Sequence, residues 1–123
     1  MENPATQQAV RVIREHFPDP DPPRLLLVLG SGWGPVVGEL ATDRRELPYP
    51  EIPGFPESTV AGHGGVLVRG TIGGAPVWIM QGRFHFYEGY DMERITFPIR
   101  VFAALGTNGV LLTNAAGGID RSF

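Results

Sequence analysis

The sequence contains no cysteine and no long apolar run, and its acidic residues outnumber its basic ones. Among 123 residues there are 10 Lys and Arg against 13 Asp and Glu, which gives a formal net charge of −3. The lack of cysteine excludes disulfides and thiolate metal sites and suits a reducing interior, so we expect a cytoplasmic protein. No apolar stretch approaches the length of a membrane span, and the first residues lack the basic and apolar pattern of a leader. We therefore expect no membrane association.

The acidic balance also argues against a nucleic-acid partner, because binding to nucleic acid requires a basic surface. It does not exclude a small phosphate ligand, since salt screens the general field beyond about 10 Å and local donors can dominate. No group of His, Asp and Glu has the spacing of metal ligands, so we expect neither a metal nor a cofactor. The hydrophobic share of 42% and the charged share of 19% are those of a globular domain.

Apolar periodicity predicts an α/β domain. Residues 6–17 form an amphipathic helix in this interpretation, with Ala9, Val10, Ile13 and Phe17 on one stripe. Residues 42–65 have scattered prolines and no sustained period, which is typical of a long surface loop. The other expected elements are strands over 25–29, 66–72, 75–80 and 109–113, with helices over 35–40 and 92–105.

These elements predict a mixed twisted sheet with flanking helices. The dipeptide Gly73-Gly74 between two apolar runs indicates an antiparallel hairpin. The remaining strands are separated by helices and are expected to pair in parallel. The last strand runs into a Gly-rich loop with no covering helix after it, so we expect an α/β domain that is incomplete at its C-terminus.

Three of the expected strands end in glycine and polar residues. Gly30-Ser31-Gly32 follows the first, Gln81-Gly82-Arg83 the second, and Asn114 to Gly118 the third. Ligands of open α/β sheets bind outside the carboxyl ends of strands, where glycines expose N–H donors to an anion. The first loop is neither a good dinucleotide fingerprint, because Pro35 holds the third glycine position, nor a Walker loop, because no lysine follows.

The segment QGRFHFYEGY, residues 81–90, concentrates charged and polar side chains that could bind a substrate. In an extended chain Arg83, His85 and Tyr87 share one face, while the two phenylalanines between them take the other. A fixed positive charge, an imidazole and a phenol together suit a small anionic substrate. Taken singly, Arg83 could be a surface salt bridge, His85 a structural histidine, and His63 a solvated loop residue. The placement of Arg83 and His85 with Tyr87 on one face, beside two Gly-rich strand ends, favours a role in ligand binding. For His63 a phosphate contact and a solvated loop position are equally open.

Four blocks of the sequence carry a family resemblance. They are GSGWG at 30–34, EIPGFPESTVAGHGG at 51–65, MQGRFHFYEGY at 80–90 and TNAAGG at 113–118. In order and spacing they resemble purine nucleoside phosphorylase of the homotrimeric type. Methylthioadenosine phosphorylases share the architecture but differ in the GRFHFYEGY region, and they are the more distant alternative.

The resemblance implies a nucleoside phosphorylase-like fold of which residues 1–123 form the amino-terminal part of a single domain. It implies phosphorolysis of purine nucleosides to the free base and ribose 1-phosphate, with inorganic phosphate as co-substrate and a homotrimer as the assembly. The family's groups for the purine base and the leaving group lie beyond Phe123. A truncated phosphate-binding module without catalysis, or a folded fragment without function, remain alternatives. The implied phosphate ligands are Ser31, His63, Arg83, His85 and the N–H of Ala115, and His85 is also the implied catalytic residue. The resemblance further places Tyr87 at the ribose, Asn114 and Ala115 at the floor between phosphate and nucleoside, and Gly117 in the base pocket.

Overall fold

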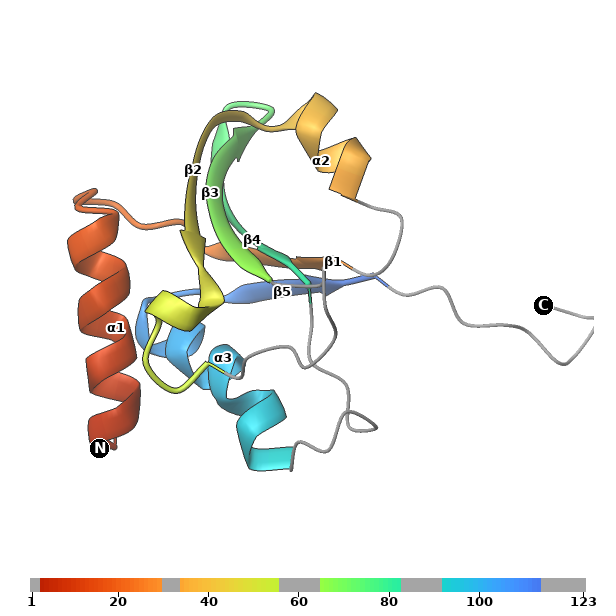
Figure 1. The fold of residues 1–123 in the computed structure, drawn as a ribbon. Helices are drawn as coiled ribbons and strands as arrows, with labels where there is room; N and C mark the ends of the chain where they lie inside the picture. Colours follow the sequence, from red (N-terminus) through yellow and green to blue (C-terminus); the bar gives the residue numbers. More distant parts are fainter. Residues whose placement is uncertain (1–2, 30–33, 56–64, 83–91, 114–123) are drawn as a thin grey trace, which may run out of the picture.

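One sheet of five strands organises the chain, and its computed structural model describes residues 3–29, 34–55, 65–82 and 92–113 (Figure 1). In chain order the elements are α1 (Pro4–His16), β1 (Leu25–Leu29), α2 (Gly34–Leu40), β2 (Thr42–Pro48), the 3₁₀ helix η1 (Tyr49–Glu51), β3 (Val66–Ile72), β4 (Ala75–Gln81), α3 (Met92–Ala104) and β5 (Gly109–Leu112). The strands lie in the order β2-β3-β4-β1-β5. The most apolar strand, β1, therefore has a neighbour on each side.

The sheet is mixed, as the sequence predicts. Strand β1 runs parallel to β4 and to β5, with Leu26 opposite both Trp78 and Val110. Strands β2, β3 and β4 pair antiparallel in succession. The predicted hairpin of β3 and β4 turns at Gly73 and Gly74, whose φ angles are +58° and +83°. Two successive positive φ values match the twist of a two-residue hairpin, which explains why glycine stands at both positions.

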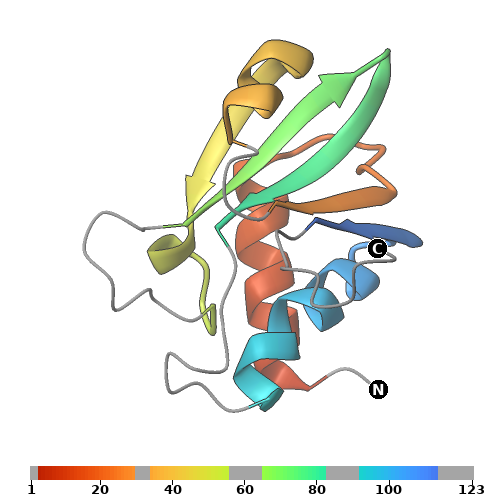
Figure 2. The ribbon, with the colours of Figure 1, turned by 90° about the vertical axis from the view of Figure 1, so that its right-hand side faces the viewer.

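Helices α1 and α3 pack against the same face of the sheet and contact each other (Figures 1 and 2). The side chain of Asn3 caps α1 by accepting a 2.8 Å hydrogen bond from the N–H of Thr6. The predicted stripe of α1 is confirmed, because all four of its residues are buried in the main core. Pro98 lies inside α3, where it is buried.

Alternate residues of β4 face opposite sides of the sheet. Trp78 and Met80 belong to the core under α1 and α3, whereas Val77 and Ile79 belong to a smaller cluster on the other face. Ala41, directly after α2, joins that second cluster, and α2 lies on the side of the sheet away from α1 (Figure 1). A strand apolar on both faces therefore marks a sheet that is covered on both sides.

The interpretation of residues 42–65 as one long loop is wrong. Residues 42–48 form β2, and Tyr49–Glu51 follows as η1. Strand β2 is the outermost strand on its side, and only Leu47 of its seven residues is buried. An edge strand that exposes both faces needs few apolar residues, so its sequence, TDRRELP, shows no alternation.

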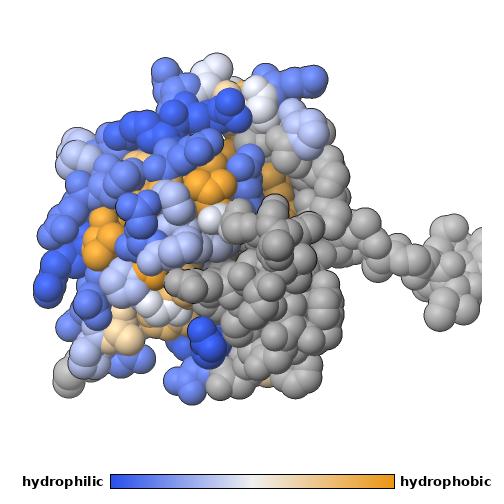
Figure 3. Space-filling view, in the orientation of Figure 1, coloured by the Kyte–Doolittle hydropathy of each residue, from blue (hydrophilic) through white to orange (hydrophobic). Residues whose placement is uncertain are grey.

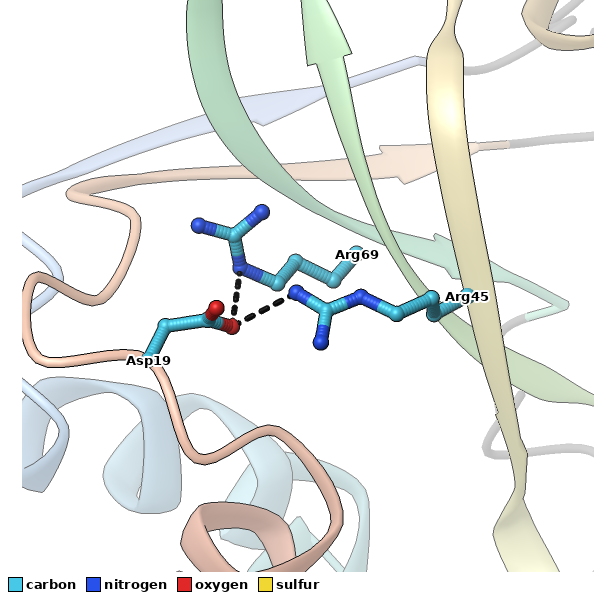
Figure 4. Close-up of polar contacts among 3 residues, drawn as sticks. All are labelled: Asp19, Arg45 and Arg69. Atoms are coloured by element: carbon cyan, nitrogen blue, oxygen red, sulfur yellow. Dashed lines mark hydrogen bonds and ion pairs between the residues drawn. The ribbon is translucent and has the colours of Figure 1, made fainter.

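Asp19, in the connector after α1, holds two arginines of the sheet (Figure 4). Its Oδ2 lies 2.6 Å from Nη2 of Arg45 on β2 and 2.9 Å from Nε of Arg69 on β3. The Arg45 contact is a hydrogen bond, whereas the Arg69 contact is an ion pair without hydrogen-bond alignment. Because the Asp19 and Arg45 side chains are 30% and 43% exposed, that pair contributes at most about 1 kcal/mol. Together the two contacts of Asp19 tie the proline-rich connector to β2 and β3.

Strand β5 forms the opposite edge of the sheet and exposes apolar side chains. Val110, Leu111 and Leu112 are 46%, 55% and 62% exposed. In contrast, the surface over α1 and β2 is mostly hydrophilic (Figure 3). None of the helices in the described ranges is long and apolar enough to cross a membrane.

Candidate functional site

The three parallel strands end together at one edge of the sheet (Figure 1). At the end of β1, Leu29 pairs with Gln81 of β4, and Val28 pairs with Leu112 of β5. Thr113 continues this contact, since its backbone N–H and its hydroxyl donate to the carbonyl of Val28 at 3.0 and 3.1 Å. The carboxyl edge, as we call this side of the sheet, is where open α/β sheets bind their ligands.

Two antiparallel strands reach the carboxyl edge as well. Val66, the first residue of β3, pairs with Gln81 at the end of β4 and with Pro48 at the end of β2. The turn of the β3–β4 hairpin lies at the far end of these strands, where Ile72 pairs with Ala75. Residues before β3 and after β2 therefore also start from the carboxyl edge.

The predicted site residues all lie outside the described residues. Their neighbours in the sequence, however, are described and meet at the carboxyl edge. Leu29 stands two positions before Ser31, Gly65 two positions after His63, Gly82 directly before Arg83, and Thr113 directly before Asn114. The structure thus brings together the points from which the four sequence blocks extend. The residues concerned are Ser31, His63, Arg83, His85, Tyr87, Asn114, Ala115 and Gly117.

Tyr49 connects two of these points through a node that it forms with Gly65 and Gly82. Its hydroxyl donates to the carbonyl of Gly82, and its backbone N–H donates to the carbonyl of Gly65 at 3.1 Å. The ring is 1% exposed and packs on Phe55 at 5.6 Å between centroids. Burial raises the pKa of Tyr49, so the hydroxyl remains a proton donor throughout the physiological range. Tyr49 was missed at the sequence level, because it stands alone among prolines just before the second block.

Gly65 leaves room for the Tyr49 ring, and we expect Gly65→Ala to destabilise the protein by about 1–3 kcal/mol. A Cβ at this position would lie 1.9 Å from Cε2 and 2.2 Å from Cδ2 of Tyr49. Urea unfolding would measure the loss. Gly109→Ala is the control, because its Cβ would meet only the tip of the flexible Leu25 side chain at 3.3 Å. Equal unfolding midpoints for the two variants would contradict this account.

One cavity beside the main core, among the described residues, lies away from the carboxyl edge. It has a volume of about 370 Å³ and lies between Phe17, Trp78 and Leu105, beside the connector at Asp19. This cavity lies where the parallel strands begin, opposite the carboxyl edge, since Pro22 and Leu105 shortly precede β1 and β5. Its charged lining residues are one arginine, Arg14, and one carboxylate, Asp19, which leaves no excess of positive charge for an anion. Among the described residues, no three His, Cys, Asp or Glu side chains gather as metal ligands would.

Comparisons with known proteins agree with this arrangement. Purine nucleoside phosphorylase 1 of Geobacillus stearothermophilus is 48% identical over all 123 residues, which are 44% of that protein's length. The solved isoform 2 of the Schistosoma mansoni enzyme, in complex with cytosine and ribose-1-phosphate, has a TM-score of 0.84 and 42% identity. A Schistosoma mansoni purine nucleoside phosphorylase in complex with inosine has a TM-score of 0.83 and 37% identity.

The similarity covers 96% of this chain and 40% of each of the two solved chains. The chain thus spans less than half the length of the relatives that it matches. The nucleoside phosphorylase-like fold that the sequence predicts is confirmed by these TM-scores. The family profile described as the Phosphorylase superfamily matches residues 24–123, which include all four sequence blocks and every strand. The chain belongs to the phosphorylase superfamily.

Proposed function

We propose that this chain supplies the phosphate site and part of the ribose site of an enzyme that cleaves purine nucleosides by phosphorolysis. The observation that carries the proposal is that the described residues next to the four motifs meet at the carboxyl edge of the sheet. The relatives support the same reaction class, since they are named purine nucleoside phosphorylases and two are solved with ribose-1-phosphate or inosine.

Each proposed role follows from the chemistry of the side chain. Arg83 offers a planar fork of donors to two phosphate oxygens, and His85 adds a ring donor to the same anion. Tyr87 contacts the ribose through its phenol. The remaining assignments follow the family pattern: Ser31, His63 and the N–H of Ala115 at the phosphate, Asn114 with Ala115 as the floor between phosphate and nucleoside, and Gly117 at the base.

The proposed reaction exchanges one bond at the ribose. An oxygen of hydrogen phosphate attacks C1′ while the bond from C1′ to the purine nitrogen breaks, and the electron pair of that bond leaves with the base. The base gains one proton and the phosphate loses one on becoming the ester, so the exchange balances. The ribosyl group becomes positive in the transition state, so an aligned phosphate dianion is both the nucleophile and an electrostatic stabiliser. Holding phosphate in line with C1′ is the task that we assign to this chain. The assembly that we propose is a homotrimer in the cytoplasm.

Phosphate dependence tests the proposed reaction. With inosine or guanosine, the intact protein is expected to release the free purine and ribose 1-phosphate only when inorganic phosphate is present. Xanthine oxidase coupled to hypoxanthine release gives the rate, and chromatography identifies the sugar product. Release of free ribose at the same rate without phosphate would show a hydrolase and overturn the proposal. Phosphate binding without turnover would leave only the binding site.

A further inference from the structure

Tyr49 is placed to control how two parts of the proposed phosphate site lie relative to each other. It is the first residue of η1, where the chain turns away from β2 at the carboxyl edge. Its backbone N–H donates to Gly65, and its hydroxyl, at the other end of the side chain, donates to Gly82. One residue therefore contacts the chain two positions after His63 and directly before Arg83.

The backbones of Gly65 and Gly82 come into contact at this node. A Cβ on Gly82 would lie 3.1 Å from the Cα of Gly65, and the φ of Gly82 is +98°, a value that favours glycine. The Tyr49 ring fills the space beside Gly65, where a Cβ would overlap the ring. The two glycines therefore let the chains approach, and the buried ring fixes the approach from one side.

The hydrogen bond to Gly82 acts on the peptide group that leads into Arg83. The carbonyl of Gly82 belongs to that planar peptide group, so a donor held on this carbonyl restricts the direction in which the chain leaves β4. The donor is well held, since Tyr49 is 1% exposed and its ring packs on Phe55. Burial also disfavours ionisation of the phenol, which keeps it a donor.

We infer that Tyr49 is a positioning residue for phosphate: its hydroxyl fixes the exit of the chain toward Arg83 against the entry of the chain from His63. The inference rests on the proposed function, in which both residues contact the anion. A residue with this role affects phosphate binding more than nucleoside binding. A residue that only fills the core affects stability and leaves the two affinities in the same ratio.

Tyr49→Phe separates these roles, because it keeps the ring and removes only the hydroxyl. We expect the KM for phosphate to rise about 10-fold, as for the loss of one net hydrogen bond, here the part-buried one to the carbonyl of Gly82. The KM for inosine should stay within about 2-fold. Val77→Ala is the control for stability. It removes buried apolar atoms of β4 on the other face of the sheet, so it is expected to lower Tm and leave the KM for phosphate unchanged.

Isothermal titration calorimetry of the intact protein with inorganic phosphate tests the positioning role of Tyr49 even if the protein shows no turnover. A phosphate Kd that rises about 10-fold in Tyr49→Phe, and not in Val77→Ala, supports the positioning role whether or not nucleoside is cleaved. Equal phosphate Kd values for Tyr49→Phe and the unaltered protein overturn that role and leave phosphorolysis standing if turnover is phosphate-dependent. An unaltered protein that neither binds phosphate nor cleaves nucleoside overturns both proposals.

Discussion

Arg83→Ala is expected to raise the KM for phosphate by roughly 30- to 1,000-fold while the protein stays folded. The range corresponds to about 2–4 kcal/mol for losing charge-assisted, bidentate hydrogen bonds to an anion. Arg83 directly follows Gly82, which the Tyr49 hydroxyl holds at the carboxyl edge. Initial rates over a wide phosphate range at saturating inosine would give the KM, and circular dichroism would check the fold.

A second arginine separates a specific contact from a general loss of positive charge. Arg24 is exposed and lies just before β1, at the opposite edge of the sheet from the strand ends. Arg24→Ala changes the net charge by the same amount as Arg83→Ala, so it should shift the KM for phosphate by less than about 2-fold, since salt screens distant charges. Similar shifts in the two variants would remove Arg83 from the phosphate site.

Trp78→Ala is expected to lower the free energy of unfolding by about 3–5 kcal/mol, a large part of the 5–15 kcal/mol typical of a domain. Trp78 is 2% exposed at the centre of β4. Its ring meets Phe17 edge-on at 5.3 Å and Phe102 at 5.7 Å between centroids, so it joins the end of α1 and helix α3 to the sheet. Urea unfolding followed by far-ultraviolet circular dichroism would measure the loss.

Two matched variants show whether the loss comes from packing. In Trp78→Phe an aromatic ring remains, and no polar partner is abandoned, because the indole Nε1 makes no hydrogen bond to any described group. Its cost should be less than half that of Trp78→Ala. Leu111→Ala, on a side chain 55% exposed in β5, should change stability by about 0.5 kcal/mol or less. A cost below 1 kcal/mol for Trp78→Ala would contradict the central place of this ring.

The parts of the fold that could be predicted have strong local signals. Two adjacent glycines between apolar runs specify the hairpin, because few other residues adopt two successive positive φ angles. The stripe of α1 repeats at the helical period and is buried as a unit. Strand β2 could not be predicted, since only Leu47 is buried and its pairing with β3 satisfies the backbone without an apolar face.

The candidate site, like the fold, has parts that the sequence could predict and parts that it could not. The polar and Gly-rich ends of β1, β4 and β5 could be placed at one edge from the sequence, because parallel strands bring their carboxyl ends together. The assignments of Ser31, Arg83, His85 and the other site residues stay predictions that the proposed variants can test. The role of Tyr49 could not be predicted, because its partner Gly82 is 33 positions away and the contact depends on tertiary structure.

The place of β1 in the sheet has a consequence for how the chain folds during synthesis. Among the five described strands β1 is the first to be made, yet its partners are β4 and β5. Leu26 meets Trp78 only after about fifty further residues. Strands β2 and β3 pair with each other, so that antiparallel pair can form before β4, the first partner of β1, has been made. During synthesis the segment LLLVL of β1 therefore remains without a partner strand until β4 is made. Exposed apolar segments of high β-propensity are the kind that aggregate or recruit chaperones.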